Sequence, residues 1–173
     1  NVNCFGGNTG SASVSVTGGT SPYAYSWNTS PVQTSATASN LIAGTWTCTI
    51  TDARGCTTSQ AVTITQPTAA LATSISAQTN VNCFGGNTGS ASVSVSGGTT
   101  PYAYSWNTSP VQTTATASNL PAGTWTCTVT DANGCATTRN VTITQPAAAL
   151  AMSGTVTPAT CGGAFNGAVD ATV

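Results

Sequence analysis

The chain has 173 residues but only two basic and three acidic side chains, no histidine and a net charge of −1. So few ionisable groups leave little material for acid–base catalysis, and two arginines cannot form the basic stripe that a phosphate backbone needs. We therefore expect no enzyme, no nucleic-acid binding, and neither a cofactor nor a metal site. No run of about 20 apolar residues is present, so we expect no membrane insertion.

The sequence repeats itself. Residues 1–67 recur almost unchanged as residues 80–146, and a weaker third copy begins near Thr160. A period of about 79 suits one small all-β domain per copy, because solenoid repeats are about 20–50 residues long. Because residue 1 falls inside a copy, we expect the chain to be part of a longer protein. Three cysteine pairs set the register, each separated by 79 positions (83 − 4, 127 − 48, 135 − 56): Cys4 and Cys83, Cys48 and Cys127, Cys56 and Cys135.

Within each copy, apolar and polar residues alternate, which is typical of strands with one buried face. In chain order the first copy predicts strands at 10–16 and 22–27, one or two short strands up to residue 40, and a strand at 45–52 that continues into a hairpin. Aromatic residues at alternate positions of a strand usually belong to the core, although their faces would also suit carbohydrate. The predicted core aromatics are Tyr23, Tyr25, Trp27, Trp46, Tyr102, Tyr104, Trp106 and Trp125.

Each hairpin has a recognisable turn, which runs from Asp52 to Gly55 and again from Asp131 to Gly134. The pattern predicts a type I turn whose glycine takes the left-handed conformation of a bulge. Such a turn places Trp46 opposite Val62, so that the apolar residues of both strands share one face. We expect the two aspartates to serve the turns through bonds to their own backbone rather than to bind calcium.

Residues 71–77 alternate once more, just before the second copy. We expect them to form the first strand of the following module, which shifts the structural unit relative to the repeat. The predicted division is residues 1–67, a module that lacks its own first strand; residues 68–146, a complete module; and residues 147–173, the N-terminal part of a third. The predicted fold class is all-β, with tandem immunoglobulin-like (PKD-like) β-sandwich modules of about 79 residues in a linear arrangement.

Several short motifs in this order resemble the SprB repeat: Cys4-Phe5-Gly6-Gly7, Gly18-Gly19-Thr20 with Pro22-Tyr23, Tyr25-Ser26-Trp27, Ala43-Gly44-Thr45, Thr51-Asp52 with Gly55-Cys56, and Thr63-Ile64-Thr65-Gln66-Pro67. The resemblance covers both full copies, and Cys161-Gly162-Gly163 begins a third in weaker form. It departs from the family at Trp46, where tyrosine is common, and at Cys48, where an aliphatic residue is common. The resemblance implies type IX secretion, a location on the outer cell surface, and a role in long adhesive filaments of gliding Bacteroidota.

The cysteines are the main chemical feature. Cys48 and Cys127 lie on the inward face of a predicted strand, and we expect them to be buried free thiols. The disulfide candidates are Cys4, Cys56, Cys83 and Cys135, together with Cys161, whose partner would lie beyond the chain.

The pairing of these candidates depends on the number of strands per module. Seven strands would place Cys83 and Cys135 at opposite poles, too far apart for the Cα separation of about 7 Å that a disulfide tolerates. Cys135 would then approach Cys4 of the preceding module. Six strands would restore pairing within each copy, Cys4 with Cys56 and Cys83 with Cys135. The sequence leaves both possibilities open. A linear array favours the inter-module bond, because the chain must enter and leave each module at opposite poles, which needs an odd number of strands.

These features predict a non-catalytic stalk repeat of a secreted surface adhesin that takes part in gliding motility or attachment. Its expected partners are neighbouring copies of the same module, with lateral self-association into fibres as a further expectation because the strand edges carry no lysine. One alternative is a lectin-like module that binds glycans or other external surfaces. A second alternative is a spacer within a larger secreted hydrolase.

Overall fold

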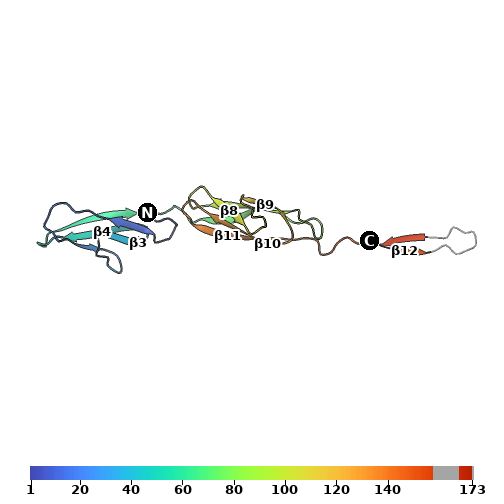
Figure 1. The fold of residues 1–173 in the computed structure, drawn as a ribbon, viewed down its shortest axis with the longest axis horizontal. Coiled ribbons are helices and arrows are strands. Elements are labelled where there is room, and N and C mark those ends of the chain that lie inside the picture. The colour runs from blue at the N-terminus through green and yellow to red at the C-terminus, as the bar shows by residue number, and fades with distance from the viewer. Residues whose placement is uncertain (158–167, 173) are drawn as a thin grey trace, which may run out of the picture.

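The computed structural model describes residues 1–157 and 168–172, and in this part of the chain every regular element is a β-strand. Two sandwich modules and a hairpin lie end to end along the long axis of the molecule (Figure 1). We call the unit formed by β1–β5 the first module and the unit formed by β6–β11 the second module. The strands are β1 (Gly10–Ser13), β2 (Ala24–Trp27), β3 (Thr37–Leu41), β4 (Gly44–Thr51), β5 (Thr57–Ile64), β6 (Ala72–Thr79), β7 (Gly89–Ser96), β8 (Ala103–Trp106), β9 (Thr116–Leu120), β10 (Gly123–Thr130), β11 (Ala136–Ile143), β12 (Ser153–Thr157) and β13 (Ala168–Thr172).

The second module is a sandwich of two antiparallel three-stranded sheets, β6-β7-β9 and β8-β10-β11. The first module has the equivalent sheet β2-β4-β5, but only a two-stranded sheet, β1-β3, opposite it. This arrangement confirms the predicted all-β fold of tandem immunoglobulin-like sandwiches. It also shows that residues 72–79 pair with β7 of the second copy.

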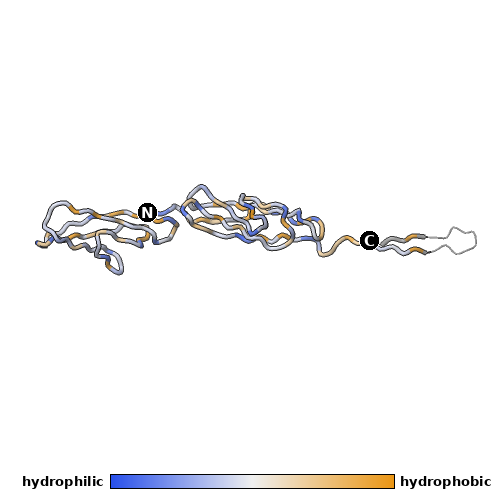
Figure 2. The backbone as a smooth tube through the Cα atoms, in the orientation of Figure 1, coloured by the Kyte–Doolittle hydropathy of each residue, from blue (hydrophilic) through white to orange (hydrophobic). Residues whose placement is uncertain are grey.

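The core of each module follows the predicted alternation of buried and exposed residues. Trp27 and Trp106 are each 1% exposed and are the largest fully buried side chains, while the remaining predicted core aromatics are partly buried and pack against the two core clusters. Figure 2 shows the corresponding alternation of apolar and polar stretches along both modules. Each Trp indole N–H donates to a nearby backbone carbonyl, that of Ser35 or Thr114, so the buried ring leaves no unpaired donor.

The hairpin register is the predicted one. Trp46 pairs with Val62 and Cys48 with Gln60, and Gly55 has φ +81°. The N–H of Asp52 donates to the carbonyl of Cys56, and that of Gly55 donates to the carbonyl of Asp52. The turn therefore sets the faces of both strands, as a bulged type I turn requires.

Of the one or two short strands expected between β2 and β4 and between β8 and β10, each module forms one, so the second module has six strands in total. Residues 107–115 join β8 to β9 without forming a strand. The side-chain amide of Gln112 bonds to the backbone of Ser118, where the backbone of a neighbouring strand would otherwise bond. Its Nε2 donates to the carbonyl of Ser118, and its Oε1 accepts from the N–H of the same residue. Gln33 and Ser39 make the same pair of bonds in the first module.

Residues 107–115 nevertheless reverse the chain direction as a seventh strand would. β8 and β9 therefore run the same way, and the chain enters and leaves the module at opposite poles. The N–H of Val81 donates to the carbonyl of Thr144, so the loop with Cys83 lies at the pole where β11 ends. Cys135 precedes β11 and lies at the other pole. We call these the exit pole and the entry pole of a module.

The first module lacks a counterpart of β6, and its β1 is shorter than predicted. The sequence pattern favoured a strand at 10–16, but β1 ends at Ser13, whereas the equivalent β7 continues to Ser96. The continuation of β7 pairs with β6, while residues 14–16 have no strand on that side. Val93 is consequently buried, at 4% exposed, whereas the equivalent Val14 is only partly buried.

β12 and β13 form an antiparallel hairpin that corresponds to β6 and β7. Val156 pairs with Val169, just as Gln78 pairs with Ala91, both 78 positions earlier (156 − 78, 169 − 91). The register of the third copy is thus that of the second, with one residue fewer. Cys161 lies outside the described residues.

β6 covers the core in the second module only. We therefore expect the same substitution to have unequal effects at two equivalent positions of the two modules. We expect Val93→Ala to destabilise the second module by about 2 kcal/mol, because it removes fully buried methyl groups and leaves a cavity. Val14→Ala should cost the first module about half as much, because its side chain already meets solvent. Hydrogen exchange read separately on peptides of each module would measure both effects, and equal losses would show that β6 does not complete the core.

Candidate functional site

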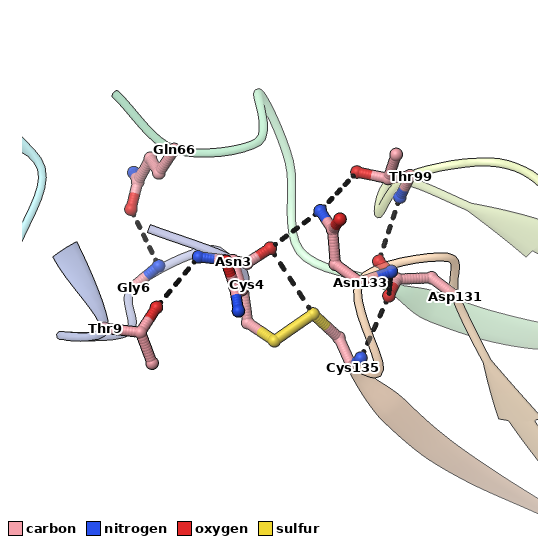
Figure 3. Close-up of a disulfide and its surroundings, with 9 residues drawn as sticks. All are labelled: Asn3, Cys4, Gly6, Thr9, Gln66, Thr99, Asp131, Asn133 and Cys135. Atoms are coloured by element: carbon pink, nitrogen blue, oxygen red, sulfur yellow. Dashed lines mark hydrogen bonds between the residues drawn. A yellow bond between two sulfur atoms is a disulfide. The ribbon is translucent and has the colours of Figure 1, made fainter. Parts of the chain in front are cut away.

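The candidate site is the junction between the two modules, where the exit pole of the first meets the entry pole of the second. A disulfide joins Cys4 to Cys135 with a Cα–Cα distance of 5.7 Å (Figure 3). This is the inter-module pairing. The intra-module pairing of Cys4 with Cys56 and of Cys83 with Cys135 does not occur, because the two members of each such pair lie at opposite poles.

The Cys4 loop is held against the end of β5 by hydrogen bonds that it donates to residues distant in sequence. The N–H of Gly6 donates to Oε1 of Gln66 at 2.8 Å, and the N–H of Val2 donates to the carbonyl of Thr65 at 2.8 Å. Gln145 and Val81 make the same contacts at the exit pole of the second module. The Gln-Pro motif that ends each copy therefore positions the cysteine loop, a role that the sequence pattern did not reveal.

On the other side of the junction, the carboxylate of Asp131 organises the turn that carries Cys135. Oδ1 accepts from the N–H groups of Asn133 and Cys135, and Oδ2 accepts from the N–H of Thr99, each at 2.9 Å. Asp131 is 5% exposed. Asp52 makes the equivalent three bonds in the first module. The aspartates thus fix both the turn and the neighbouring Gly-Gly loop.

Asn133 adds a direct polar contact across the junction. Its Nδ2 donates to the carbonyl of Asn3 at 3.1 Å and to the hydroxyl of Thr99 at 3.0 Å. The sulfur of Cys135 lies 3.6 Å from the same Asn3 carbonyl, but this is a contact and not a hydrogen bond, because a disulfide sulfur carries no proton. At the entry pole of the first module, Arg54 stands in the place of Asn133.

The linker between the modules is packed rather than free. The N–H of Gly98 donates to the carbonyl of Ala69 at 3.0 Å. A Cβ at Gly97 would lie 2.0 Å from the carbonyl oxygen of Ala70, and one at Gly98 would lie 3.0 Å from a methyl carbon of Leu71. The linker therefore needs both glycines of the second module in order to pass so close. A small cavity of about 180 Å³ remains beside it, lined by Phe5, Leu71 and the disulfide among others.

The other cysteines are free thiols, two of them buried and two exposed, although Cys56 and Cys83 were disulfide candidates. Cys48 and Cys127 are free thiols with no exposed surface, and burial raises the pKa of both. Cys56 and Cys83 are exposed free thiols. Cys56 lies at the entry pole of the first module and Cys83 at the exit pole of the second, so each occupies the position that is disulfide-bonded in the other copy.

The described residues contain no cluster of three or more Cys, Asp, Glu or His side chains that could hold a metal ion. They also form no helix long and apolar enough to cross a membrane. Two similar grooves border Trp46 and Trp125, lined in each module by the equivalent Thr, Ser, Pro, Gln and Asn side chains. The indole N–H of Trp46 donates to the carbonyl of Ile42, which holds the ring in place.

Fold and junction together define the chain as a tandem array of immunoglobulin-like sandwich modules that are covalently joined pole to pole. The model of the SprB repeat matches residues 1–32 and 75–111, which confirms the resemblance to the SprB repeat family at two segments of the chain. The second match begins inside β6 and so includes part of the strand that the first module lacks. No curated protein sequence matches the chain.

Among solved structures, the chain is similar to the three N-terminal domains of the highly immunogenic outer capsid protein (Hoc) of bacteriophage RB49. The identity is 15% and the TM-score 0.42, and the match covers 79% of this chain. It spans 50% of that structure's length. So distant a likeness carries no argument about function.

The ionisable groups predict that the stability of the fold is independent of pH except at low pH, where the aspartates titrate, and at high pH, where the buried thiols titrate. Burial disfavours the charged form of Asp131, but the hydrogen bonds that its carboxylate accepts from backbone N–H groups outweigh burial and lower its pKa. The pKa of Asp52 is also lowered, mainly by the hydrogen bond from the Cys56 N–H. A carboxyl with a lowered pKa stabilises the fold above its unfolded pKa of about 3.9, and that contribution is lost as the pH falls through the folded value. The raised pKa of the two buried thiols acts in the opposite sense. Their contribution is present below about pH 8.5, the unfolded value for a thiol, and is lost at higher pH.

We therefore expect the melting temperature to be constant between about pH 4 and pH 8.5 and to fall on either side. Asp131→Asn should lower the melting temperature at pH 7 and flatten the acid limb, because the amide cannot ionise and cannot accept the Thr99 N–H through its nitrogen. Calorimetry from pH 2 to pH 10 measures this profile. A steep change between pH 5 and pH 8 would contradict it.

Two equivalent glycines give a matched test of the packed linker. Gly97 and Gly18 both have positive φ, +67° and +77°, so alanine brings a similar backbone cost of about 1 kcal/mol at either site. Only Gly97 has the linker in contact, since a Cβ at Gly18 meets nothing within 4 Å. We expect Gly97→Ala to cost about 1–3 kcal/mol more than Gly18→Ala, as overpacking does. Hydrogen exchange of residues 69–79 would report the loss, and equal effects would show that the linker is not held.

Proposed function

We propose that the chain is a non-catalytic stalk segment of a secreted cell-surface adhesin, in which disulfides between successive modules carry tension along the filament. The observation that carries this proposal is the Cys4–Cys135 bond, which connects residues 131 positions apart near the point where the modules meet. The SprB repeat match supports a surface location, and a disulfide suits an oxidising compartment outside the cytosol. Gliding motility and attachment are the processes that such a filament would serve.

The path of the covalent chain determines which residues bear the tension. A force applied to both ends reaches Cys4 and can pass directly through the disulfide to Cys135. Most of the first module and most of the second lie inside the closed loop, so they bear none of this tension. Even if their sheets opened, the loop could not lengthen the molecule. A stalk built in this way keeps its length under loads that would unfold single sandwiches.

Junction packing supports the same role. The N–H of Gly98 donates to the linker carbonyl of Ala69, the Asn133 side chain donates to the Asn3 carbonyl, and the disulfide joins Cys4 to Cys135. Three separate attachments restrain bending, whereas a free linker would permit it. The scarcity of charge also suits an exposed filament, because the attachments depend little on salt.

Pulling single molecules of the full chain from both ends tests the proposal. The disulfide should hide the contour length of 131 residues, about 430–470 Å at about 3.3–3.6 Å per residue. Oxidised protein should lack this length, and reduced protein should release it.

Two variants serve as controls. Cys135→Ser should behave like reduced protein in either buffer, and Cys127→Ser, which alters a buried thiol, should retain the dependence on reductant. Equal extension with and without reductant would refute the tension-bearing role. Antibody labelling of intact producing cells tests the surface location separately, and labelling only after lysis would refute that part.

A further inference from the structure

Each module has a groove beside a tryptophan that takes no part in the junction. We propose that this groove binds a sugar ring of a neutral polysaccharide, with Trp46 as the stacking platform in the first module and Trp125 in the second. The inference rests on the adhesive part of the proposed function, to which it adds a binding site and a ligand class. It does not depend on the tension that the disulfide carries.

The groove opens between two loops near the exit pole of each module. In the first module it has a volume of about 420 Å³, and its walls come from residues 29–33, which follow β2, and residues 39–42 at the end of β3. Trp46 of β4 completes the lining. The groove of the second module has about 490 Å³ and is lined by the equivalent residues, Trp125 among them. Both volumes fall within the range of about 300–1,000 Å³ that is typical of small-molecule sites.

Comparison of the two modules shows that the groove is a property of the module itself. The first module lacks a counterpart of β6, and its junction with the second module is complete. The second module contains β6 and has the same groove. The groove therefore forms with or without β6, and a disulfide-bonded neighbour at the exit pole does not cover it.

Hydrogen bonds hold the two walls of the groove together. The side-chain amide of Gln33 donates to the carbonyl of Ser39 and accepts from its N–H, each at 2.9 Å, and so joins one wall to the other. The N–H of Gln33 donates to the hydroxyl of Thr29 at 3.0 Å. The same bonds recur in the second module between Gln112, Ser118 and Thr108. Walls that are fixed before binding reduce the conformational entropy that a ligand must overcome.

The tryptophan of the groove is fixed in position but is not fully covered. The indole N–H of Trp46 donates to the carbonyl of Ile42 at 3.0 Å, and that of Trp125 to the carbonyl of Pro121 at 3.1 Å. Both rings are only partly buried, whereas Trp27 of the same sandwich is 1% exposed. A sugar ring presents C–H groups on its faces, and the electron-rich face of an aromatic ring attracts them.

The rim of the groove offers polar groups that are free to bind a ligand. Asn40 is exposed and has φ +55°, a left-handed conformation that asparagine tolerates, and Asn119 has φ +56°. Within the described residues, no hydrogen bond engages either side-chain amide or the hydroxyl of Ser30. An amide offers both donors and an acceptor, and a hydroxyl offers both as well, so these groups match the hydroxyls of a sugar.

The lining also indicates which ligands fit poorly. None of the lining side chains is charged, so nothing in the groove would balance a carboxylate, sulfate or phosphate. Proline-rich peptides bind to aromatic-lined grooves, whereas each groove here contains a single aromatic ring. A neutral sugar ring needs one aromatic face and several uncharged hydrogen-bonding groups, which is what the groove provides.

Repetition of the groove suits a repeating ligand. Each module carries one site, so an array presents a row of sites to a polysaccharide that itself repeats one kind of ring. Linked sites that are weak singly can hold a polymeric ligand strongly, because each later binding event is intramolecular. The adhesive role would then be distributed along the stalk.

The first experiment uses the tryptophans of the full chain as reporters. The chain has four tryptophans, so the nitrogen-labelled protein gives four indole N–H signals in NMR spectra. Separate titrations with cellohexaose, mannohexaose and galactohexaose should find at least one that shifts the signals of Trp46 and Trp125 to saturation. The signals of Trp27 and Trp106, each 1% exposed, should not move. No saturable shift with any of the three sugars, or equal shifts of all four signals, would overturn the proposal.

Two further probes test the ligand class. Hexagalacturonate has the same length but is charged, and it should bind more weakly than the neutral sugar that binds best. Hexaproline should leave the signals of Trp46 and Trp125 unchanged. Equal affinity for hexagalacturonate would overturn the preference for a neutral ligand, and saturable binding of hexaproline in place of the sugars would identify a peptide site instead.

A pair of glycine variants tests the site itself. Glycine keeps the left-handed backbone at positions 40 and 119 and removes only the amide. Asn40→Gly should weaken binding at Trp46 about tenfold, as loss of one hydrogen bond does, and leave binding at Trp125 unchanged. Asn119→Gly should do the reverse, so each variant is the matched control of the other. Unchanged binding at Trp46 in Asn40→Gly would refute the assigned site.

These titrations are separate from the tests of the stalk. Reduction of the Cys4–Cys135 bond should not alter the shifts of Trp46 and Trp125, because the disulfide does not line either groove. The pulling experiment examines the disulfide alone and contains no sugar. Failure of the sugar titrations would therefore leave the tension-bearing role intact, and failure of the pulling experiment would leave the binding site intact.

Discussion

The opposite placement of entry and exit is the constraint on which the rest of the structure depends. A chain that enters one pole of a sandwich and leaves by the other can only build a row. It also places the two exposed-loop cysteines of each module, Cys4 and Cys56 or Cys83 and Cys135, at opposite poles, so a disulfide between such cysteines can form only across a junction. The reversal that produces this parity comes from residues 107–115, where one glutamine side chain does what a strand would otherwise do. The covalent connectivity of the array thus depends on a short loop in which Gln112 is the central residue.

A disulfide at every junction between modules would shorten the covalent path along the whole array, which a single disulfide cannot do. Cys161 repeats the position of Cys83, and only 26 residues separate it from Cys135 (161 − 135). If every seam were bonded, the shortest covalent route would pass through such segments and would bypass the modules between them. A segment of 26 residues spans at most about 90 Å when extended. Such an array would extend no further than these segments allow, even if its sheets opened.

The sequence allowed much of this fold to be predicted, because its information is local and periodic. The turn from Asp52 to Gly55 fixed the register of the hairpin, and alternation located the strands and the inward Cys48. What could not be predicted depends on distant partners. Nothing near Gln66 indicates that its side chain will hold Gly6, 60 residues away, and nothing at residues 14–16 indicates that β1 will end at Ser13. The strand count stayed open for the same reason, since Gln112 satisfies the backbone of Ser118 in a way that periodicity does not detect.

The two hairpin aspartates show how so few charges can still organise the molecule. A carboxylate offers two oxygens with several lone pairs, so a single Asp131 can bind three N–H groups from two loops. One of these loops holds the linker through Gly98, and the other carries Cys135. The position of the disulfide and the path of the linker are therefore coupled through one side chain. A neutral amide would offer only one accepting atom, so an array that relies on this coupling has reason to keep its aspartates even where almost every other charge is absent.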